Sequence, residues 1–298
     1  MSTLCLGEAL VDLICQRPVE DVADVDAFVP TFGGAVANVA VVAARRGGRM
    51  ALAGGAGEDA WGQWLRDRLE DEGVDLPWFS LMPGTSTPIA LVTVDGVGEP
   101  SYEIYGEGIA AVVHALESRV AEAVEASDAL FFSSNTLIGP DEREVTMEAR
   151  KRALELDRPV IFDPNLRLNR WPSRAEAAAT ANACVPGALL VRANLAEAAL
   201  MTGEADPERA ASAILKAGAR LVVISLGADG AILRGELDAD ALAPEVEVMS
   251  TVGAGDVLTG VLLARLAATG FYPPAVAASL SEAVAEGAAA CERWGALE

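Results

Sequence analysis

The chain has 298 residues, 52% of them hydrophobic, and 44 acidic against 22 basic residues give it a net charge of −22. This composition supports a sizeable core and excludes disorder, while the length allows one large domain or a core domain with a small appendage. An acidic chain without a basic block is a poor partner for nucleic acid or anionic membranes. No apolar run approaches the roughly 20 residues that span a bilayer, and the first residues lack the basic region of a signal peptide. We therefore expect a cytoplasmic protein.

Several kinds of catalytic site are excluded by the rarity of the residues that they need. His114 is the only histidine, which argues against a histidine metal site and a Ser-His-Asp triad. Lys151 and Lys216 are the only lysines and no Walker phosphate loop occurs. The four cysteines show no CxxC spacing and are expected to be reduced, mostly interior thiols. Any phosphate chemistry would therefore use backbone N–H groups, arginine and a metal ion.

The N-terminal part predicts a strand, an irregular segment and a helix. The apolar run Thr3–Cys15 predicts one central strand, with Asp12 near the end where open α/β sheets bind ligands. After an irregular stretch, Gly33 and Gly34 precede an Ala/Val-rich helix that contains Asn38. Paired glycines permit close approach of a ligand to the backbone, and Asn38 can hydrogen-bond a hydroxyl; an ordinary helix-capping loop is the alternative.

The next segment contains a second glycine-rich turn. Met50–Gly54 predicts a strand, and Gly55–Ala60 at a helix start matches the loose dinucleotide pattern G-x-G-x-x-A. A lone match of this kind is weak, but it leaves a nucleotide-dependent oxidoreductase as an alternative. Glu58–Gly73 predicts an amphipathic helix with a buried stripe. That stripe comprises Trp61, Trp64, Leu65 and Leu69.

A change of pattern between residues 74 and 108 predicts a small antiparallel unit. Thr87–Val94 and Ser101–Tyr105 have strand character on either side of the turn dipeptide Asp95-Gly96. A hairpin that interrupts a βαβ pattern indicates a flap or lid.

Alternating helices and strands then return and indicate a doubly wound, mainly parallel α/β fold. The expected helices are Leu116–Ala126, Asp141–Leu156, Ser173–Cys184 and Ala275–Arg293, and the expected strands are Ala129–Ser133, Pro159–Phe162, Ala188–Val191, Arg220–Ser225 and Ala231–Arg234. The loop Asp163–Arg167 follows a strand end, so Arg167 is a candidate for binding a phosphate or sugar hydroxyls; a surface turn is the alternative. Asn194 to Glu197 has the pattern of a helix capping box, which structural capping alone would explain.

The stretch Ser250–Asp256 is the strongest candidate for an active site. Gly253, Ala254 and Gly255 form a turn that leads into the apolar segment Val257–Ala268. A helix that begins at such a turn leaves backbone N–H groups free to bind an anion. Asp256 would lie beside that anion, where a carboxylate can accept a proton from an alcohol that attacks a phosphoryl group. An acidic residue at an ordinary helix start is the alternative.

Taken together, these motifs resemble the ribokinase-like (PfkB) family of sugar kinases over essentially the whole length. Its first signature matches Gly33, Gly34, Asn38, Ala40, Gly47 and Gly57, and its second matches Thr251, Gly253, Ala254, Gly255 and Asp256. The early sugar-binding acid of the family matches Asp12, its N-x-x-E motif matches Asn194 and Glu197, and its phosphate-binding strand and turn match Ser225 and Gly227.

The resemblance implies one ribokinase-like domain over residues 1–298, with lid segments at about 12–31 and 85–108. It implies that Asp256 is the base and that the N–H groups of Gly253, Ala254 and Gly255 hold the γ-phosphoryl group of ATP. The sugar-binding residues that it implies are Asp12, Gly33, Gly34, Asn38, Tyr105 and Arg167. The implied nucleotide-binding residues are Asn194, Glu197, Ser225, Gly227 and Gly230, the first two also holding Mg²⁺ through water. A homodimer through the lid is also expected.

Two departures from the family bear on cation and substrate. Ser250 replaces an aspartate that belongs to a potassium site in many members, which puts activation by K⁺ in doubt. Gly106 stands where 2-keto-3-deoxygluconate kinases have an arginine, which counts against a carboxylate-bearing substrate. The closing segment Cys291–Ala296 is similar to fructokinases, so we expect fructose. A ketodeoxygluconate kinase, another PfkB sugar or nucleoside kinase, and a non-catalytic sugar- or nucleotide-binding regulator are the alternatives.

Overall fold

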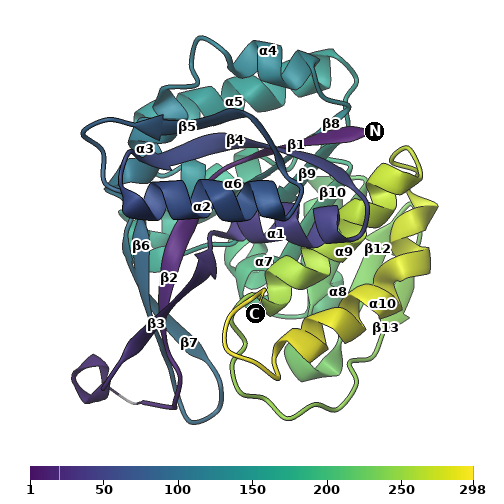
Figure 1. The fold of residues 1–298 in the computed structure, drawn as a ribbon. Coiled ribbons are helices and arrows are strands. Elements are labelled where there is room, and N and C mark those ends of the chain that lie inside the picture. Colours follow the sequence, from purple (N-terminus) through teal and green to yellow (C-terminus); the bar gives the residue numbers. More distant parts are fainter. Residues whose placement is uncertain (20, 298) are drawn as a thin grey trace.

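A nine-stranded sheet runs through the centre of the computed structural model, which describes residues 1–19 and 21–297 (Figure 1). In sheet order its strands are β13 (Ala239–Ala241), β12 (Ala231–Gly235), β11 (Leu221–Ser225), β10 (Leu190–Asn194), β9 (Val160–Asp163), β8 (Ala129–Ser133), β1 (Ser2–Leu6), β4 (Arg49–Gly57) and β5 (Asp75–Met82). From β11 to β5 the neighbouring strands are parallel, and the two strands at the other edge are antiparallel. The predicted doubly wound, mainly parallel α/β fold is therefore confirmed.

Helices cover both faces of this sheet. One face packs against α1 (Ala35–Arg45), α2 (Ala60–Asp71), α9 (Ala254–Ala268) and α10 (Pro274–Ala290). The opposite face packs against α3 (Glu107–His114), α4 (Val120–Glu125), α5 (Pro140–Glu155), α6 (Arg174–Ala183), α7 (Leu195–Thr202) and α8 (Pro207–Lys216). Strand β1 shows why both faces need to be covered, because alternate side chains of a strand point to opposite faces of the sheet. Leu4 and Leu6 belong to one buried cluster and Cys5 to the other.

A separate four-stranded sheet projects from one end of the large sheet (Figure 1). Its strands are, in order, β3 (Phe28–Gly33), β2 (Leu10–Cys15), β6 (Ile89–Val94) and β7 (Pro100–Tyr105). The predicted hairpin is present, because β6 and β7 pair antiparallel. The Asp95 carboxylate stabilises its turn by accepting N–H bonds from Val97 and Glu99, each at 2.9 Å.

The prediction of one central strand over Thr3–Cys15 was wrong. The segment forms β1 in the large sheet and β2 in the small one, with a break at residues 7–9. At this break Gly7 lies against α1, and a Cβ there would be 2.4 Å from Cγ2 of Val36. The chain therefore turns from one sheet into the other at a close helix contact that apolar patterning does not reveal.

The glycine-rich turn at residues 55–60 also differs from its prediction. Gly55 lies inside β4, and α2 begins only at Ala60, where the side chain of Asp59 accepts the Gly62 N–H at 2.9 Å. These glycines thus belong to a strand and not to a helix start that could bind a dinucleotide. Of the predicted buried stripe, Leu65 and Leu69 are fully buried. Trp61 is 40% exposed, so its assignment to the core was wrong.

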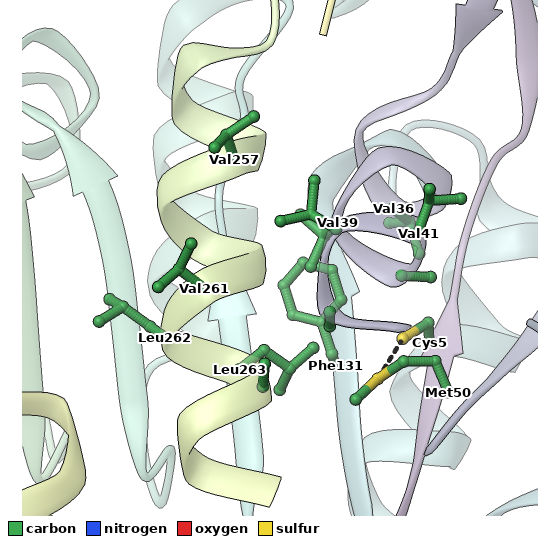
Figure 2. Close-up of a cluster of buried hydrophobic side chains, with 14 of the residues drawn as sticks. Cys5, Val36, Val39, Val41, Met50, Phe131, Val257, Val261, Leu262 and Leu263 are labelled. Atoms are coloured by element: carbon green, nitrogen blue, oxygen red, sulfur yellow. Dashed lines mark hydrogen bonds between the residues drawn. The ribbon is translucent and has the colours of Figure 1, made fainter. Parts of the chain in front are cut away.

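Helix α9 is apolar on almost every side because it is enclosed by its neighbours. It packs between α1 and α10, and Figure 2 shows Val257 and Val261 of α9 in the same buried cluster as Val39 of α1 and Phe131 of β8. Close approach to α1 requires Gly260, where a Cβ would be 2.6 Å from the Val42 side chain. This packing fixes the position of the residues at the start of α9.

Candidate active site

A pocket of about 360 Å³, including the part open to solvent, lies between the small sheet and the start of α9. The lining includes polar groups from both parts of the molecule, namely Glu8, Asp12, Asn38, Tyr102, Asn135, Arg167 and Asp256. Four adjacent parallel strands, β8 to β11, end nearby in Ser133, Asp163, Asn194 and Ser225. Ligands bind at this edge of open α/β sheets, so the pocket has the expected place.

Asp256 lies in the first turn of α9 and is 8% exposed. Its carboxylate accepts a hydrogen bond from Nδ2 of Asn38 at 2.8 Å and a longer one from Nδ2 of Asn165 at 3.4 Å. Burial raises the pKa of Asp256 to about 7, although the bond from Asn38 and the charge of Arg167 oppose this rise. The structure thus brings a carboxyl group with the pKa of a general base to the pocket.

The turn before Asp256 requires glycine at its first position. Gly253 has φ of 76° and caps α9 in the left-handed region, where glycine carries no steric penalty. Ala254 donates its N–H to the Thr251 carbonyl at 3.3 Å. The N–H groups of Gly255 and Asp256 lie in the helix's first turn, where the helix itself supplies no acceptor. These two groups are the best placed to bind an anion beside the carboxylate.

Asp12 and the paired glycines form the side of the pocket on the small sheet. A Cβ at Gly33 would lie 2.4 Å from the Asp12 carboxyl group, so only glycine leaves room for that side chain. Gly34 has φ of 99°, and a Cβ there would be 2.6 Å from the Glu8 carbonyl oxygen. Burial raises the pKa of Asp12 to about 8, with a further contribution from the negative charge of Asp256.

Arg167 supplies the positive charge that borders this group of carboxyls. It lines the pocket, and its guanidinium lies 4.5 Å from the centre of the Tyr102 ring, a cation–π contact. The structure does not bring Tyr105 to the pocket. Its ring is 55% exposed and its hydroxyl donates to Glu103 at 3.1 Å. In β7 side chains alternate between the two faces of the sheet, and it is Tyr102 that reaches the pocket.

The proposed nucleotide-binding residues lie together on the neighbouring strand ends. Asn194 and Ser225 are register partners across β10 and β11, and Gly227 begins the exposed turn that follows β11. Gly230 closes this turn; it is buried, and a Cβ there would be 1.9 Å from the Ala241 carbonyl oxygen. Gly230 is therefore a turn residue, whereas the other three lie at or next to the carboxyl ends of β10 and β11.

Asn194 and Glu197 form a capping box at the start of α7. Asn194 Oδ1 accepts the Glu197 N–H at 2.8 Å, and Glu197 Oε2 accepts the Asn194 N–H at 2.9 Å. Glu197 Oε1 accepts the Leu166 N–H at 2.8 Å and so ties α7 to the loop that carries Arg167. Because all three oxygens already accept backbone N–H groups, these residues fit Mg²⁺ through water better than by direct ligation. Among residues 1–19 and 21–297, no group of three or more His, Cys, Asp or Glu residues could itself hold a metal ion.

Ser250 is fully buried and lies shortly before the glycine turn that starts α9. Its Oγ accepts the Val252 N–H at 3.2 Å, and its backbone N–H donates to the Cys291 carbonyl at 3.1 Å. The position thus carries a neutral hydroxyl group that is already engaged with the backbone.

A buried ion pair below the start of α9 was not predicted from the sequence. Arg192 Nη1 lies 3.3 Å from Asp163 Oδ2, and Nη2 donates to Ser225 Oγ at 2.9 Å. A Cβ at Gly255 would be 2.8 Å from this guanidinium, so Arg192 lies directly against the glycine turn that starts α9. The only sequence signal was an arginine directly after the expected apolar strand Ala188–Val191, where a buried charge is costly unless it is paired.

Glu8 and Asn135, which line the pocket, and Asn165, which bonds to Asp256, were not predicted to be site residues from the sequence. Glu8 is an acidic residue within the apolar run Thr3–Cys15, and Asn135 follows a buried strand. Asn165 has φ of 40°, an uncommon conformation for a residue other than glycine, and it directs its amide toward Asp256. The position of Asn165 between Asp163 and Arg167 was the available signal.

Comparison with known proteins agrees with this geometry. Residues 2–295 match the model of the pfkB family of carbohydrate kinases. Probable fructokinase-4 of Arabidopsis thaliana is 29% identical over 267 residues, which is 87% of this chain and 80% of that protein. Aminoimidazole riboside kinase of Salmonella typhimurium is 30% identical over 295 residues, covering 98% of this chain and 89% of that protein.

A solved structure shows the same fold. The crystal structure of fructokinase from Vibrio cholerae O395 in fructose, ADP and calcium ion bound form superposes with a TM-score of 0.85 at 28% identity, covering 99% of this chain and 94% of that one. The family match spans the paired glycines, the strand ends and the turn at Gly253 that form the pocket described above. The chain therefore belongs to the pfkB family of carbohydrate kinases and is a sugar kinase.

Proposed function

We propose that this kinase transfers the γ-phosphoryl group of ATP to a primary hydroxyl group of fructose. The observation that carries the proposal is the place of Asp256 beside the free N–H groups of the α9 start, in a pocket that also contains Asp12, Asn38 and Arg167. A base and an anion site next to one another are what phosphoryl transfer to an alcohol requires.

In this mechanism Asp256 accepts the proton of the attacking hydroxyl group. Asn38 holds the carboxylate by its bond at 2.8 Å, and the N–H groups of Gly255 and Asp256 stabilise the charge on the phosphoryl oxygens. Asp12 and Arg167 bind hydroxyl groups of the sugar and orient it. Mg²⁺ with ATP neutralises phosphate charge when bound, and Asn194 and Glu197 are the residues that we propose hold its water ligands.

The charge of the pocket supports a neutral sugar. Three carboxyl groups line it, from Glu8, Asp12 and Asp256, and Arg167 is the only basic side chain among the described lining residues. Asp256 must be ionised to act as the base, so a carboxylate-bearing substrate such as 2-keto-3-deoxygluconate would meet at least this negative charge, which disfavours its binding. An aminoimidazole riboside has no such charge, so it is the alternative substrate that a test must include.

The test is ADP release from Mg-ATP over a panel of fructose, ketodeoxygluconate and aminoimidazole riboside, with and without potassium. We expect turnover with fructose to exceed that with the other two. We expect K⁺ to change the rate little, because Ser250 offers a neutral hydroxyl that already bonds to Val252. Preferred turnover of another sugar would overturn fructose alone, while silence with all sugars and retained sugar binding would favour a non-catalytic regulator. A strong K⁺ requirement would contradict the second expectation.

The rate should rise with pH through neutrality. Asp256 must be deprotonated to act as a base, and its pKa is raised from 3.8 to about 7. We therefore expect log kcat/KM to fall by about one unit per pH unit below about pH 7. Asp12 and Asp256 interact, so the profile reports the pair. A flat profile between about pH 5 and about pH 8 would contradict the assignment.

The stability should change in the opposite direction. Asp12 and Asp256 each bind a proton more tightly in the folded state than in the unfolded chain. Their protonation therefore contributes to the free energy of unfolding in full below about pH 4, and this contribution is lost as the pH rises through about 7 to 8. Thermal unfolding of the wild type and of Asp12→Asn across this range measures the contribution. We expect the pH dependence to be weaker in the variant.

We further propose that the small sheet is a lid on a single domain. Its hairpin already contacts the loop before α9, where the Thr251 N–H donates to the Gly98 carbonyl at 2.8 Å. A lid that excludes water would favour transfer to the sugar over ATP hydrolysis. Strands β3 and β7 are its two edges, and pairing of such edges across a two-fold axis is the homodimer that we propose.

A cytoplasmic location is also part of this proposal. All four cysteines are free and buried, as expected in a reducing compartment. No helix in the described part of the chain is long and apolar enough to cross a membrane.

A further inference from the structure

One part of the pocket carries a polar group that the phosphoryl-transfer mechanism does not use. Glu8 lies between β1 and β2, and Asn135 lies directly after β8; both line the pocket. Glu8 is 1% exposed and Asn135 is 4% exposed. Buried polar groups of this kind need partners, so their hydrogen bonds can be counted one by one.

The count leaves one carboxylate oxygen without a partner. Glu8 Oε1 accepts both the Ala35 N–H at 2.9 Å and Nδ2 of Asn135 at 2.8 Å. Glu8 Oε2 is buried and has no hydrogen-bond partner among the described residues. The bond to Glu8 uses one of the two amide hydrogens of Asn135, so the second remains available on the same side chain.

The orientation of the Asn135 amide is fixed from the other side. Arg170 Nη1 donates to Asn135 Oδ1 at 3.2 Å, which requires the amide nitrogen to face Glu8. Arg170 lies where the small sheet meets α3, because a Cβ at Gly106 would be 3.1 Å from its Nη2. Burial raises the pKa of Glu8, whereas its own backbone N–H, the bond from Asn135 and the charge of Arg170 oppose this rise.

An unpartnered acceptor next to an available donor matches a hydroxyl group, which both donates and accepts. We propose that Glu8 and Asn135 bind one hydroxyl group of the sugar other than the one that is phosphorylated, and so select for a polyhydroxylated substrate. Arg170 acts through Asn135 and is a positioning residue. This inference rests on the proposed function and deepens it. An analogue without this hydroxyl would leave the buried Oε2 unpaired, which is how such sites reject deoxy substrates.

The test is Glu8→Gln, which keeps the shape of the side chain. The amide oxygen can retain both bonds made by Oε1, so the change is confined to replacing the acceptor at Oε2 by a donor. Kinetics are measured with the sugar that the wild type phosphorylates best and with analogues that each lack one hydroxyl group. We expect kcat/KM for the parent sugar to fall by about 10- to 100-fold, with the KM for ATP unchanged.

The pattern over the analogues identifies the contact. For one analogue, the one that lacks the bound hydroxyl, the variant and the wild type should agree within about twofold, because there is no bond left to lose. Asn135→Ala keeps the bond from Ala35 to Glu8 and should show the same pattern on the same analogue. Arg170→Met should lower kcat/KM for the parent sugar by a smaller factor, with no loss for that same analogue. Arg170→Lys should restore part of this kcat/KM.

Glu142→Gln is the matched control. Glu142 is also buried, its Oε1 accepts the Gly139 N–H at 2.6 Å at the start of α5, and its charge acts on Arg170, but it does not line the pocket. It should leave sugar kinetics unchanged, which separates the contact from a general loss of charge. Equal losses for the parent sugar and every analogue in Glu8→Gln, or no loss at all, would overturn the inference while the kinase assignment stands. A wild type that phosphorylates no sugar would instead overturn the proposed function.

Discussion

Replacing Asp256 by asparagine is expected to lower kcat by about 10³-fold or more, since general base catalysis contributes up to about 10⁴-fold. The substitution preserves the size of the side chain, and its amide can still interact with Asn38, so the pocket keeps its shape. It removes the group that we propose accepts the proton of the sugar hydroxyl. Steady-state ADP release measures kcat, and calorimetric titration measures the binding of sugar and of ATP, both of which we expect to be largely retained.

Asp67→Asn is the control for this experiment. Asp67 is a carboxylate on the exposed side of α2 that accepts a bond from Gln63 at 2.7 Å, far in the chain from any pocket residue. It should leave both turnover and binding unchanged. Turnover of Asp256→Asn close to that of the wild type would show that another group takes the proton, and the mechanism would have to be abandoned.

Replacing Gly253 by alanine is expected to reduce kcat by about 10²- to 10³-fold, the effect of losing an oxyanion-type donor. Gly253 has φ of 76°, and an added Cβ would lie 2.1 Å from the Cβ of Ala296. Both are backbone-anchored atoms, so the turn itself must shift, and the N–H groups of Gly255 and Asp256 shift with it. Thermal unfolding and kcat are measured together, because the strain also lowers the free energy of unfolding.

Gly73→Ala separates strain from misplacement of the turn. Gly73 has φ of 77°, nearly the value at Gly253, but a Cβ there would have nothing within 4 Å. This variant should lose stability by about 1 kcal/mol, the ordinary cost of alanine in the left-handed region, with full activity. If Gly253→Ala also retained full activity, the turn would not be the anion site that we propose.

The fold was largely predictable because the long helices and buried strands carry strong periodic signals. The hairpin of the small sheet was found for a local reason, since Asp95-Gly96 determines its turn. The elements that were not predicted include β3, β5, α3 and β13, each of which is stabilised by contacts with distant segments. The division of Thr3–Cys15 into two strands was missed for the same reason, since both halves are apolar and differ only in the sheet that they join.

The site shows the same division between local and distant causes. The motif around Gly253 and Asp256 could be recognised, because a glycine turn and a helix start are encoded by adjacent residues. The partners of Asp256 could not be derived from spacing, since Asn38 lies 218 residues away in the chain and Asn165 lies 91 away. The choice between Tyr102 and Tyr105 likewise depends on which face of β7 meets the pocket.

By itself the sequence determined the class of fold, the glycine turn at the start of the last apolar helix but one and the resemblance to sugar kinases, because each depends on periodicity or on residues that are neighbours in the chain. Only the tertiary structure decided which carboxyl groups share the pocket, that burial raises the pKa values of Asp12 and Asp256, and that Oε2 of Glu8 is left without a partner. The physical reason is that desolvation and hydrogen bonding depend on what packs around a group, and here the packing groups come from strands and loops far apart in the sequence.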